Sequence, residues 1–377
     1  MRISLADPVS YTIPYDQSMA GALARRGHDV DFLCASFLFA ELEPPDGYRR
    51  HEIFFRHSAR LLRRNPRSRL RFLAKGIEYA PNARRLRKEL ERIDPDVLHV
   101  QWLGLPRVDL RWLEASARVR PVVFTAHDVL PRRTEKKVEL WRRVFETVDR
   151  VVVHGERAVD ELAAHGVNRA RIVRIPHPVF EPPPDRALSS PTGTTLMFFG
   201  LIRAAKGLDL LVRALPLVAD QVPEVRLIVA GDPIESVDPL RKVAADLGVA
   251  GRIDWRLRFF PDSEIPDLLE EATVVVLPYR KIESSGVLAT ALGHGRPVVV
   301  TDVGSLGDTV REFGAGVVAH PNDPSSLAAS CVALLREEAL VEAARGTQAA
   351  REALTWERSA EAHERLYEQI LADRGLR

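Results

Sequence analysis

The chain has 377 residues, 46% of them hydrophobic, and a formal net charge of +2. This length allows roughly two to three domains with cores of their own, and so small a net charge excludes a polycation, so any attraction to anions must come from local patches. No apolar run approaches the roughly 20 residues that span a bilayer, and two lone cysteines with no signal peptide before the first strand predict a reducing cytoplasmic compartment.

The first half of the chain alternates short apolar runs with helical patterns, which is typical of a doubly wound parallel sheet of the α/β class. The predicted strands cover residues 3–5, 30–34, 97–100, 122–125, 151–153 and 172–175. Ligands of such sheets bind beyond the carboxyl ends of the strands, so the loops that follow the strands are the candidate ligand-binding segments. The loop after the first strand is expected to lead into a helix over residues 18–26.

A basic segment follows between residues 56 and 75, with seven arginines, one lysine and no acidic residue. Leucines and a phenylalanine lie between the cations. Such a segment can lie on an anionic lipid surface, where each basic residue contributes about 1 kcal/mol. Peripheral contact with the inner face of the membrane is one interpretation of this segment, and a solvated helix face and a groove for an anionic acceptor are the other two.

Three consecutive prolines, Pro182 to Pro184, cannot continue a helix or a central strand, so an extended linker is expected around them. Strands are predicted again beyond it, over residues 196–199, 226–230, 253–255, 274–277, 298–300 and 316–318. The chain is thus divided into a domain of residues 1–180, a second α/β domain of residues 181–355, and a terminal helix within residues 356–377.

A glycine-bounded loop joins the first strand of the second domain to a helix predicted over residues 208–218. Gly200 stops the strand, Gly207 precedes the helix, and Arg203 and Lys206 lie between them. Unpaired N–H groups at a helix start favour anions, and the two cations add charge beside them. The loop therefore predicts a diphosphate site that suits a sugar nucleotide; a surface turn with two solvated charges is the alternative.

A second strand, loop and helix follow within residues 274–300. Ser284 and Ser285 are natural N-caps, and Gly286 lets a ligand approach the backbone closely. In this order and at this spacing, the two stretches resemble the GT-B glycosyltransferases, specifically the retaining enzymes of family 4. The resemblance covers essentially the whole chain. It implies two Rossmann-like domains that face a cleft, with the terminal helix crossing back to the first domain.

The resemblance implies a retaining, metal-independent hexosyltransferase that moves a sugar from a nucleoside diphosphate donor, UDP or GDP, to a hydroxyl acceptor. Polysaccharide, glycolipid or natural-product biosynthesis is the expected setting, with no cofactor and no nucleic acid. The implied catalytic residues are Lys206, Arg203, Glu283 and His127. The implied donor-binding residues are Gly200, Gly207, Gly231, Asp232, Arg258, Ser284, Ser285, Gly286, Val287 and Leu288. The implied acceptor-binding residues are Tyr15, Asp16, Gln101, Trp102 and Asp128.

Some of these residues also have a purely structural interpretation: Tyr15 and Asp16 as part of a turn, and His127 as a histidine held in the turn at the end of a strand. Two departures from the family pattern also stand out. The family's arginine follows the loop glycine directly, whereas this chain has Leu201 there and Arg203 two residues further on. The family often has two glutamates separated by seven residues, and Ala291 replaces the second. Two rival functions therefore stay open: a sugar-nucleotide epimerase or hydrolase of the same fold, and a catalytically degenerate partner subunit.

The chain has no zinc-type Cys/His cluster and no complete Gly-x-Gly-x-x-Gly fingerprint, so neither a metal nor a dinucleotide is expected.

Overall fold

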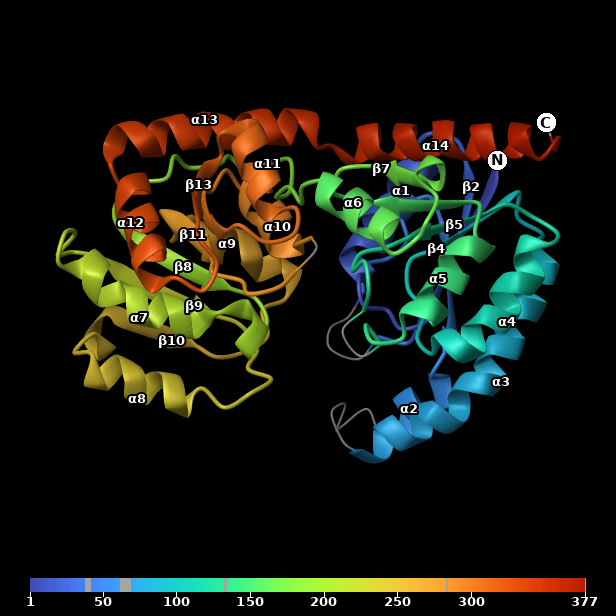
Figure 1. Ribbon diagram of the computed structural model, residues 1–377, viewed down its shortest axis with the longest axis horizontal. Helices are drawn as coiled ribbons and strands as arrows, with labels where there is room; N and C mark the ends of the chain where they lie inside the picture. The colour runs from blue at the N-terminus through green and yellow to red at the C-terminus, as the bar shows by residue number, and fades with distance from the viewer. Residues whose placement is uncertain (38–41, 62–68, 132–133, 283, 377) are drawn as a thin grey trace. The chain divides into compact units, whose positions relative to one another are not determined.

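The computed structural model describes residues 1–37, 42–61, 69–131, 134–282 and 284–376. These residues form two compact units, Met1–Pro176 with Trp356–Arg377, and His177–Thr355. Each unit is built on one parallel sheet with helices around it (Figure 1), which confirms the predicted α/β class. In this part of the chain, no helix combines the length and the apolarity needed to span a bilayer.

The sheet of the first unit has seven strands in the order β3-β2-β1-β4-β5-β6-β7. The strands are β1 (Arg2–Asp7), β2 (Asp29–Ala35), β3 (Arg49–Phe54), β4 (Val97–Val100), β5 (Val122–Thr125), β6 (Arg150–Val153) and β7 (Ile172–Arg174). The helices are α1 (Ile13–Arg25), α2 (Arg56–Leu61), α3 (Arg69–Ile93), α4 (Pro106–Ala117), α5 (Val138–Thr147), α6 (Glu156–Ala164) and α14 (Trp356–Asp373). Since β1 pairs with β2 on one side and β4 on the other, the switch point of the topology lies beyond β1 and β4.

The sheet of the second unit has six strands in the order β10-β9-β8-β11-β12-β13. The strands are β8 (Thr195–Phe199), β9 (Arg226–Ala230), β10 (Ile253–Arg256), β11 (Val274–Leu277), β12 (Val298–Thr301) and β13 (Gly316–Ala319). The helices are α7 (Leu208–Ala219), α8 (Asp238–Asp246), α9 (Ile265–Glu270), α10 (Gly286–Gly293), α11 (Leu306–Phe313), α12 (Pro324–Leu334) and α13 (Glu337–Ala353). Strand β8 pairs with β9 on one side and with β11 on the other. The switch point of this sheet therefore lies beyond β8 and β11.

The inner strands are apolar along their whole length because helices cover both faces of each sheet. All four residues of β4, β5, β11 and β12 are buried. The helices supply apolar faces to match; in α7, Leu208, Leu211, Leu215 and Val218 are all buried. These positions confirm the face predicted from their spacing.

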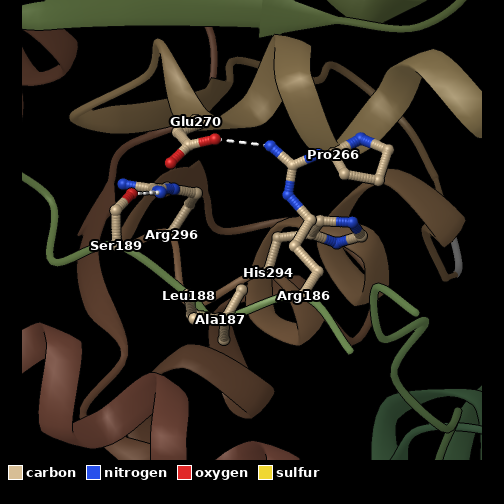
Figure 2. Close-up of a pocket in the computed structure, with 8 residues that line it drawn as sticks. All are labelled: Arg186, Ala187, Leu188, Ser189, Pro266, Glu270, His294 and Arg296. Carbon is tan, nitrogen blue, oxygen red and sulfur yellow. Dashed lines mark hydrogen bonds and ion pairs between the residues drawn. The ribbon is translucent and has the colours of Figure 1, made fainter. Parts of the chain in front are cut away.

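The proline-rich linker runs along the second unit without forming a helix or strand, as predicted. It lies beside α9, where the Arg186 guanidinium forms ion pairs with Asp267 at 2.5 Å and with Glu270. Figure 2 shows the pair with Glu270. The Ser189 hydroxyl accepts a hydrogen bond of 2.6 Å from the Arg296 guanidinium. The linker is therefore anchored to the second unit by polar contacts.

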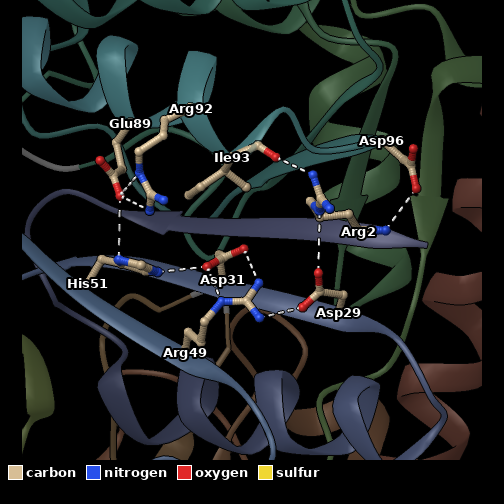
Figure 3. Close-up of polar contacts among 9 residues, drawn as sticks. All are labelled: Arg2, Asp29, Asp31, Arg49, His51, Glu89, Arg92, Ile93 and Asp96. Carbon is tan, nitrogen blue, oxygen red and sulfur yellow. Dashed lines mark hydrogen bonds and ion pairs between the residues drawn. The ribbon is translucent and has the colours of Figure 1, made fainter.

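Strand β3 has no counterpart among the predicted strands. Its sequence begins with two arginines and a histidine, and polar contacts hold it at the edge of the sheet (Figure 3). The Arg49 guanidinium donates to both oxygens of Asp31, at 2.9 and 2.7 Å, and His51 Nε2 lies 2.6 Å from the same carboxylate. Although burial acts to raise the pKa of Asp31, these hydrogen bonds lower it to about 2. An edge strand of this kind lacks the apolar run by which the others are found.

Two helices differ from their predicted bounds. Helix α1 starts at Ile13, five residues before the predicted start, because Pro14 suits the first turn of a helix. Of the basic segment, residues 62–68 lie outside the described residues, while Arg56 and Arg60 are exposed on α2. The Glu78 carboxylate of α3 accepts hydrogen bonds from the backbone N–H groups of His57 and Ser58, so α2 is tied to α3.

The terminal helix α14 belongs to the first unit, although the second unit precedes it in the chain. The Tyr367 hydroxyl lies 2.6 Å from His99 Nδ1 of β4, and both residues are buried. At the end of α14, the Arg374 guanidinium donates to both oxygens of Asp149, at 2.8 Å each. The sheet and the last helix are thus joined by buried as well as surface contacts.

Candidate functional site

The loop between β8 and α7 presents its two cations in different ways. It contains a 3₁₀ turn over Ala204–Lys206 and ends at Gly207, which has a left-handed φ of 65°. Arg203 is half-buried, whereas Lys206 is only 8% exposed. A lysine this buried has lost most of its water, so its position must be fixed by the protein.

Lys206 lies against an aromatic ring. Its Nζ is 3.6 Å from the ring centroid of Tyr279, just after β11, and the Tyr279 ring is itself buried. The negative face of the ring attracts the ammonium, and the interaction is strengthened by the loss of water. The Tyr279 carbonyl accepts a hydrogen bond of 2.5 Å from Thr301 Oγ1, which fixes this residue to the neighbouring strand β12.

Arg280, the next residue, fastens the loop that carries Lys206. Its guanidinium donates to both oxygens of Asp209 at 2.6 Å each and to the Ala204 carbonyl at 2.9 Å. Its backbone N–H donates to the Ala205 carbonyl at 3.0 Å. A bidentate pair of this kind adds geometric precision as well as energy, so Arg280 holds both the 3₁₀ turn and the first turn of α7.

Two positions at the carboxyl edge of this sheet require glycine, because the backbone of another loop lies directly against them. A Cβ on Gly207 would lie 1.9 Å from the carbonyl oxygen of Pro278. A Cβ on Gly231, with φ of 154°, would lie 1.8 Å from the carbonyl oxygen of Gly200. The loops after β8, β9 and β11 therefore meet backbone to backbone, and the structure brings these predicted site glycines together.

The second predicted loop caps α10. Ser285 Oγ accepts a hydrogen bond of 3.4 Å from the N–H of Leu288, so Ser285 is the N-cap as predicted. Gly286 is exposed and Val287 half-buried, while the Leu288 side chain belongs to the core. The first N–H groups of α10 lack partners within the helix and favour an anion. Ser284 is half-buried, and Glu283 lies outside the described residues.

The remaining donor candidates lie in the loops after β9 and β10. The carbonyl of Asp232 accepts a hydrogen bond of 3.0 Å from the N–H of Ile202, which connects this loop to the one after β8. Arg258 is exposed, forms an ion pair with Glu264 and lies 3.9 Å from the ring centroid of Phe260. Arg258 therefore already has protein partners.

In the first unit, His127 lies at the centre of a polar aromatic cluster. Its Nε2 is 3.0 Å from Gln101 Oε1, and its Nδ1 is 3.3 Å from His154 Nε2. The Trp102 ring stacks on the imidazole with a centroid distance of 5.4 Å, and Tyr15 meets it edge-on at 4.9 Å. The structure thus brings four of the sequence-predicted residues together, with His154 as a neighbour that the prediction did not include.

These predicted residues differ in how much of each side chain is exposed. Gln101, Tyr15 and Asp16 are at most 2% exposed, while Trp102 and Asp128 are half-buried. Of these five residues, only Trp102 and Asp128 therefore expose enough surface to contact an acceptor directly.

The Asp7 carboxylate, which the prediction missed, accepts hydrogen bonds from the N–H groups of residues 9 to 12. Asp16 lies beside it, and burial, with the charge of Asp7, raises the pKa of Asp16 well above its ordinary value. Asp7 and Asp16 thus organise the loop from within.

The prediction also missed Tyr279, Arg280 and Asp209. All three were visible in sequence as the residues directly after a strand or in the first turn of a helix, the positions that border a ligand site in parallel sheets. Their partners, however, are set by the pairing of β8 with β11. Among the described residues, no group of three or more His, Cys, Asp or Glu side chains is arranged to hold a metal ion.

Two family models match the chain. The model described as "Glycosyltransferase Family 4" matches residues 17–180, and the one described as "Glycosyl transferases group 1" matches residues 193–337. Together these matches cover most of both units.

Curated proteins give a consistent picture. The chain is 29% identical over 304 residues to the D-inositol 3-phosphate glycosyltransferase of Mycolicibacterium paratuberculosis, a match that covers 71% of this chain and 65% of that protein. It is 27% identical to the protein of the same name from Streptomyces bingchenggensis, covering 74% of this chain and 65% of that one. In both cases the match spans just under two thirds of the relative's own length.

Solved structures share the fold at low identity. Sucrose-phosphate synthase from Thermosynechococcus elongatus has a TM-score of 0.72 at 17% identity, with 99% of this chain and 100% of that chain covered. Anabaena HepE in complex with UDP-glucose has a TM-score of 0.71 at 16% identity, with 99% and 100% covered. The likeness places the two Rossmann-like sheets of this chain in the GT-B fold class.

Proposed function

The chain belongs to the glycosyltransferases of group 1 and family 4, and from that premise we propose that it moves a sugar from a nucleoside diphosphate to a hydroxyl acceptor with retention of configuration. The observation that carries the proposal is the buried ammonium of Lys206, held over Tyr279 where α7 begins. Charge builds on the departing diphosphate as the bond between the anomeric carbon and the phosphate oxygen breaks. A cation fixed there in advance stabilises the transition state more than the ground state.

The donor diphosphate is proposed to lie between the start of α7 and the start of α10. Arg203 and Lys206 supply positive charge, and the N–H groups of Gly286 and Val287 supply hydrogen bonds at a helix start. Gly200 and Gly231 leave this edge of the sheet without side chains, so a ligand can approach the backbone. UDP is the first nucleotide to test, because HepE has been solved with UDP-glucose, and GDP is the second.

The acceptor is proposed to bind at the carboxyl edge of the first unit, beside Trp102, Asp128 and His127. The relatives named D-inositol 3-phosphate glycosyltransferases make a polyol phosphate the first acceptor class to test. In the proposed reaction the acceptor hydroxyl attacks the anomeric carbon on the face that the diphosphate leaves. The acceptor's proton passes to a phosphate oxygen, so no protein nucleophile is needed. Because cations already neutralise the leaving group, the reaction is proposed to need no metal.

Calorimetric titration with UDP, GDP, ADP and dTDP tests the donor site. We expect one nucleotide to bind the wild type and its affinity to fall about 10- to 100-fold in Lys206→Ala, since a charge-assisted hydrogen bond is worth about 1.5–3 kcal/mol. Lys242→Ala, which removes an exposed lysine of α8 in the same unit, is the matched control and should bind normally. Equal loss in both variants, or no binding by the wild type, would refute the assignment.

Analysis of products separates the proposal from its rivals. A transferase consumes the sugar nucleotide only when an acceptor is present, whereas a hydrolase or epimerase converts it alone. Binding without any turnover would favour a degenerate partner subunit.

A further inference from the structure

The second unit has a pocket far from the carboxyl edge of its sheet. It lies where α10 ends and β12 has not yet begun, which is the opposite, amino edge (Figure 2). The pocket is small and partly open to solvent. Its enclosed space is far below the roughly 300–1,000 Å³ of drug-sized ligand sites, so only a small ligand suits it. It is lined by Arg186, Ala187, Leu188, Ser189, Pro266, Glu270, His294 and Arg296.

Arg296 is a buried cation with no ion-pair partner in the described part of the chain. Its side chain is 2% exposed, yet its hydrogen bonds go only to the Ala272 carbonyl at 3.3 Å and to Ser189 Oγ at 2.6 Å. Its Nε is buried and has no hydrogen-bond partner within that part of the chain. A buried charge normally requires an opposite charge or a full set of hydrogen bonds. Nε and Nη2 form one edge of the guanidinium, the edge that binds oxyanions in pairs of parallel hydrogen bonds.

His294 is the second buried group of the pocket with a nitrogen that has no hydrogen-bond partner among the described residues. It is 6% exposed, and its Nδ1 donates a hydrogen bond of 2.8 Å to the Thr290 carbonyl. The proton is therefore on Nδ1, which leaves Nε2 as an acceptor, and Nε2 has no partner. Burial lowers the pKa of His294, so the ring is neutral at pH 8. The pocket thus offers one charged donor edge and one neutral acceptor.

We propose that this pocket binds a small phosphate anion, either free hydrogenphosphate or the phosphate group of a small monoester. The anion's oxygens would accept from the Nε edge of Arg296 and from the hydroxyl of Ser189, which is exposed and lies at the entrance. The P–OH of hydrogenphosphate would donate to His294 Nε2. Water can satisfy the same two atoms but adds no negative charge to that of Glu270, which already attracts Arg296, and sulfate has no proton for His294.

The lining sets the direction in which each substitution acts. Glu270 is the one acidic residue among the eight that line the pocket, and it pairs with Arg186, which also pairs with Asp267. Removing the charge of Glu270 leaves Arg186 a carboxylate partner and lowers the repulsion of an anion. A purely structural role for the pocket would not make Glu270→Gln bind anions more tightly.

The test is a calorimetric titration with inorganic phosphate and with sulfate at pH 8 and fixed ionic strength. We expect saturable phosphate binding to the wild type, binding at least tenfold weaker in Arg296→Gln, tighter binding in Glu270→Gln, and weaker binding of sulfate. Lys206→Ala should bind phosphate normally. Loss of phosphate binding in Lys206→Ala would place the anion at the donor loop and overturn the proposal. No phosphate binding by the wild type would overturn it as well, because water then suffices.

Two further arms complete the design. Circular dichroism reports whether Arg296→Gln folds; if it does not, Glu270→Gln and Lys206→Ala still decide between the two sites. Titration with glycerol 3-phosphate distinguishes the source of the anion. Binding tighter than that of inorganic phosphate identifies a monoester, and weaker binding identifies free phosphate, and either supports the site. Because donor binding is scored on Lys206 and phosphate binding on Arg296, failure of the phosphate site leaves the proposed transferase function untouched.

Discussion

Replacing Gly207 by alanine gives a direct test of how the donor loop is held. Gly207 and Gly314 have nearly the same backbone conformation, with φ of 65° in both and ψ of 24° and 27°. A Cβ at Gly207 would lie 1.9 Å from the Pro278 carbonyl oxygen, whereas one at Gly314 would meet nothing within 4 Å. Both variants are therefore destabilised by about 1–2 kcal/mol, the free-energy cost of an alanine in the left-handed conformation. Only Gly207→Ala also introduces the clash with the Pro278 carbonyl oxygen.

The clash sets the expected difference between the two variants. Backbone has to move to admit the methyl group, and overpacking of this kind costs about 1–3 kcal/mol. We expect Gly207→Ala to lower the free energy of unfolding, measured by urea titration, by about 1–3 kcal/mol more than Gly314→Ala does. Nucleotide affinity should fall in Gly207→Ala alone, because Lys206 is the adjacent residue. Equal destabilisation of the two variants would refute the argument that the backbone contact holds the loop.

Three other predictions concern the site and its surroundings. Arg280→Lys and Asp209→Asn should each reduce kcat/KM for the donor about tenfold or more. The double variant should be little worse than either single variant, since each substitution removes the same bidentate pair. Additive losses in the double-mutant cycle would contradict this. Burial lowers the pKa of His154 and His363 to about 4 from 6.5. The stability gained by keeping them neutral is complete above pH 6.5 and declines as the pH falls towards 4, so the urea midpoint should drop across that interval and less so in His363→Gln. Transfer activity should survive EDTA within about twofold; its loss, with recovery on adding a divalent metal, would show that the cations of the loop do not suffice.

The fold could be predicted from the sequence where the apolar runs are strong. All twelve predicted strands are present. Nine of them are inner strands of a parallel sheet, which are buried on both faces and therefore leave a near-continuous apolar run in the sequence. Strand β3 was missed because its first four residues, Arg49 to Glu52, face polar partners at the edge of the sheet. The sequence predicts the start of α1 five residues too late, because Tyr15 and Asp16 have the character of a loop that faces a ligand.

The site was predictable in its position and less so in its contacts. The cation loop and the serine N-cap are local signals, readable from glycines, charges and capping residues. The roles of Tyr279 and Arg280 depend on residues about seventy positions away, which only the sheet brings near. Burial of Tyr15 and Gln101 likewise depends on packing that no single stretch of sequence reveals.

The membership of α14 in the first unit has a consequence for how the protein is made. Tyr367 reaches its partner His99 only after the whole of the second unit has been synthesised. Asp373, at the end of α14, comes 197 residues after Pro176, and translation at about 5–20 residues per second takes roughly 10–40 s over that distance. During this interval the apolar face of the first unit that α14 covers stays open.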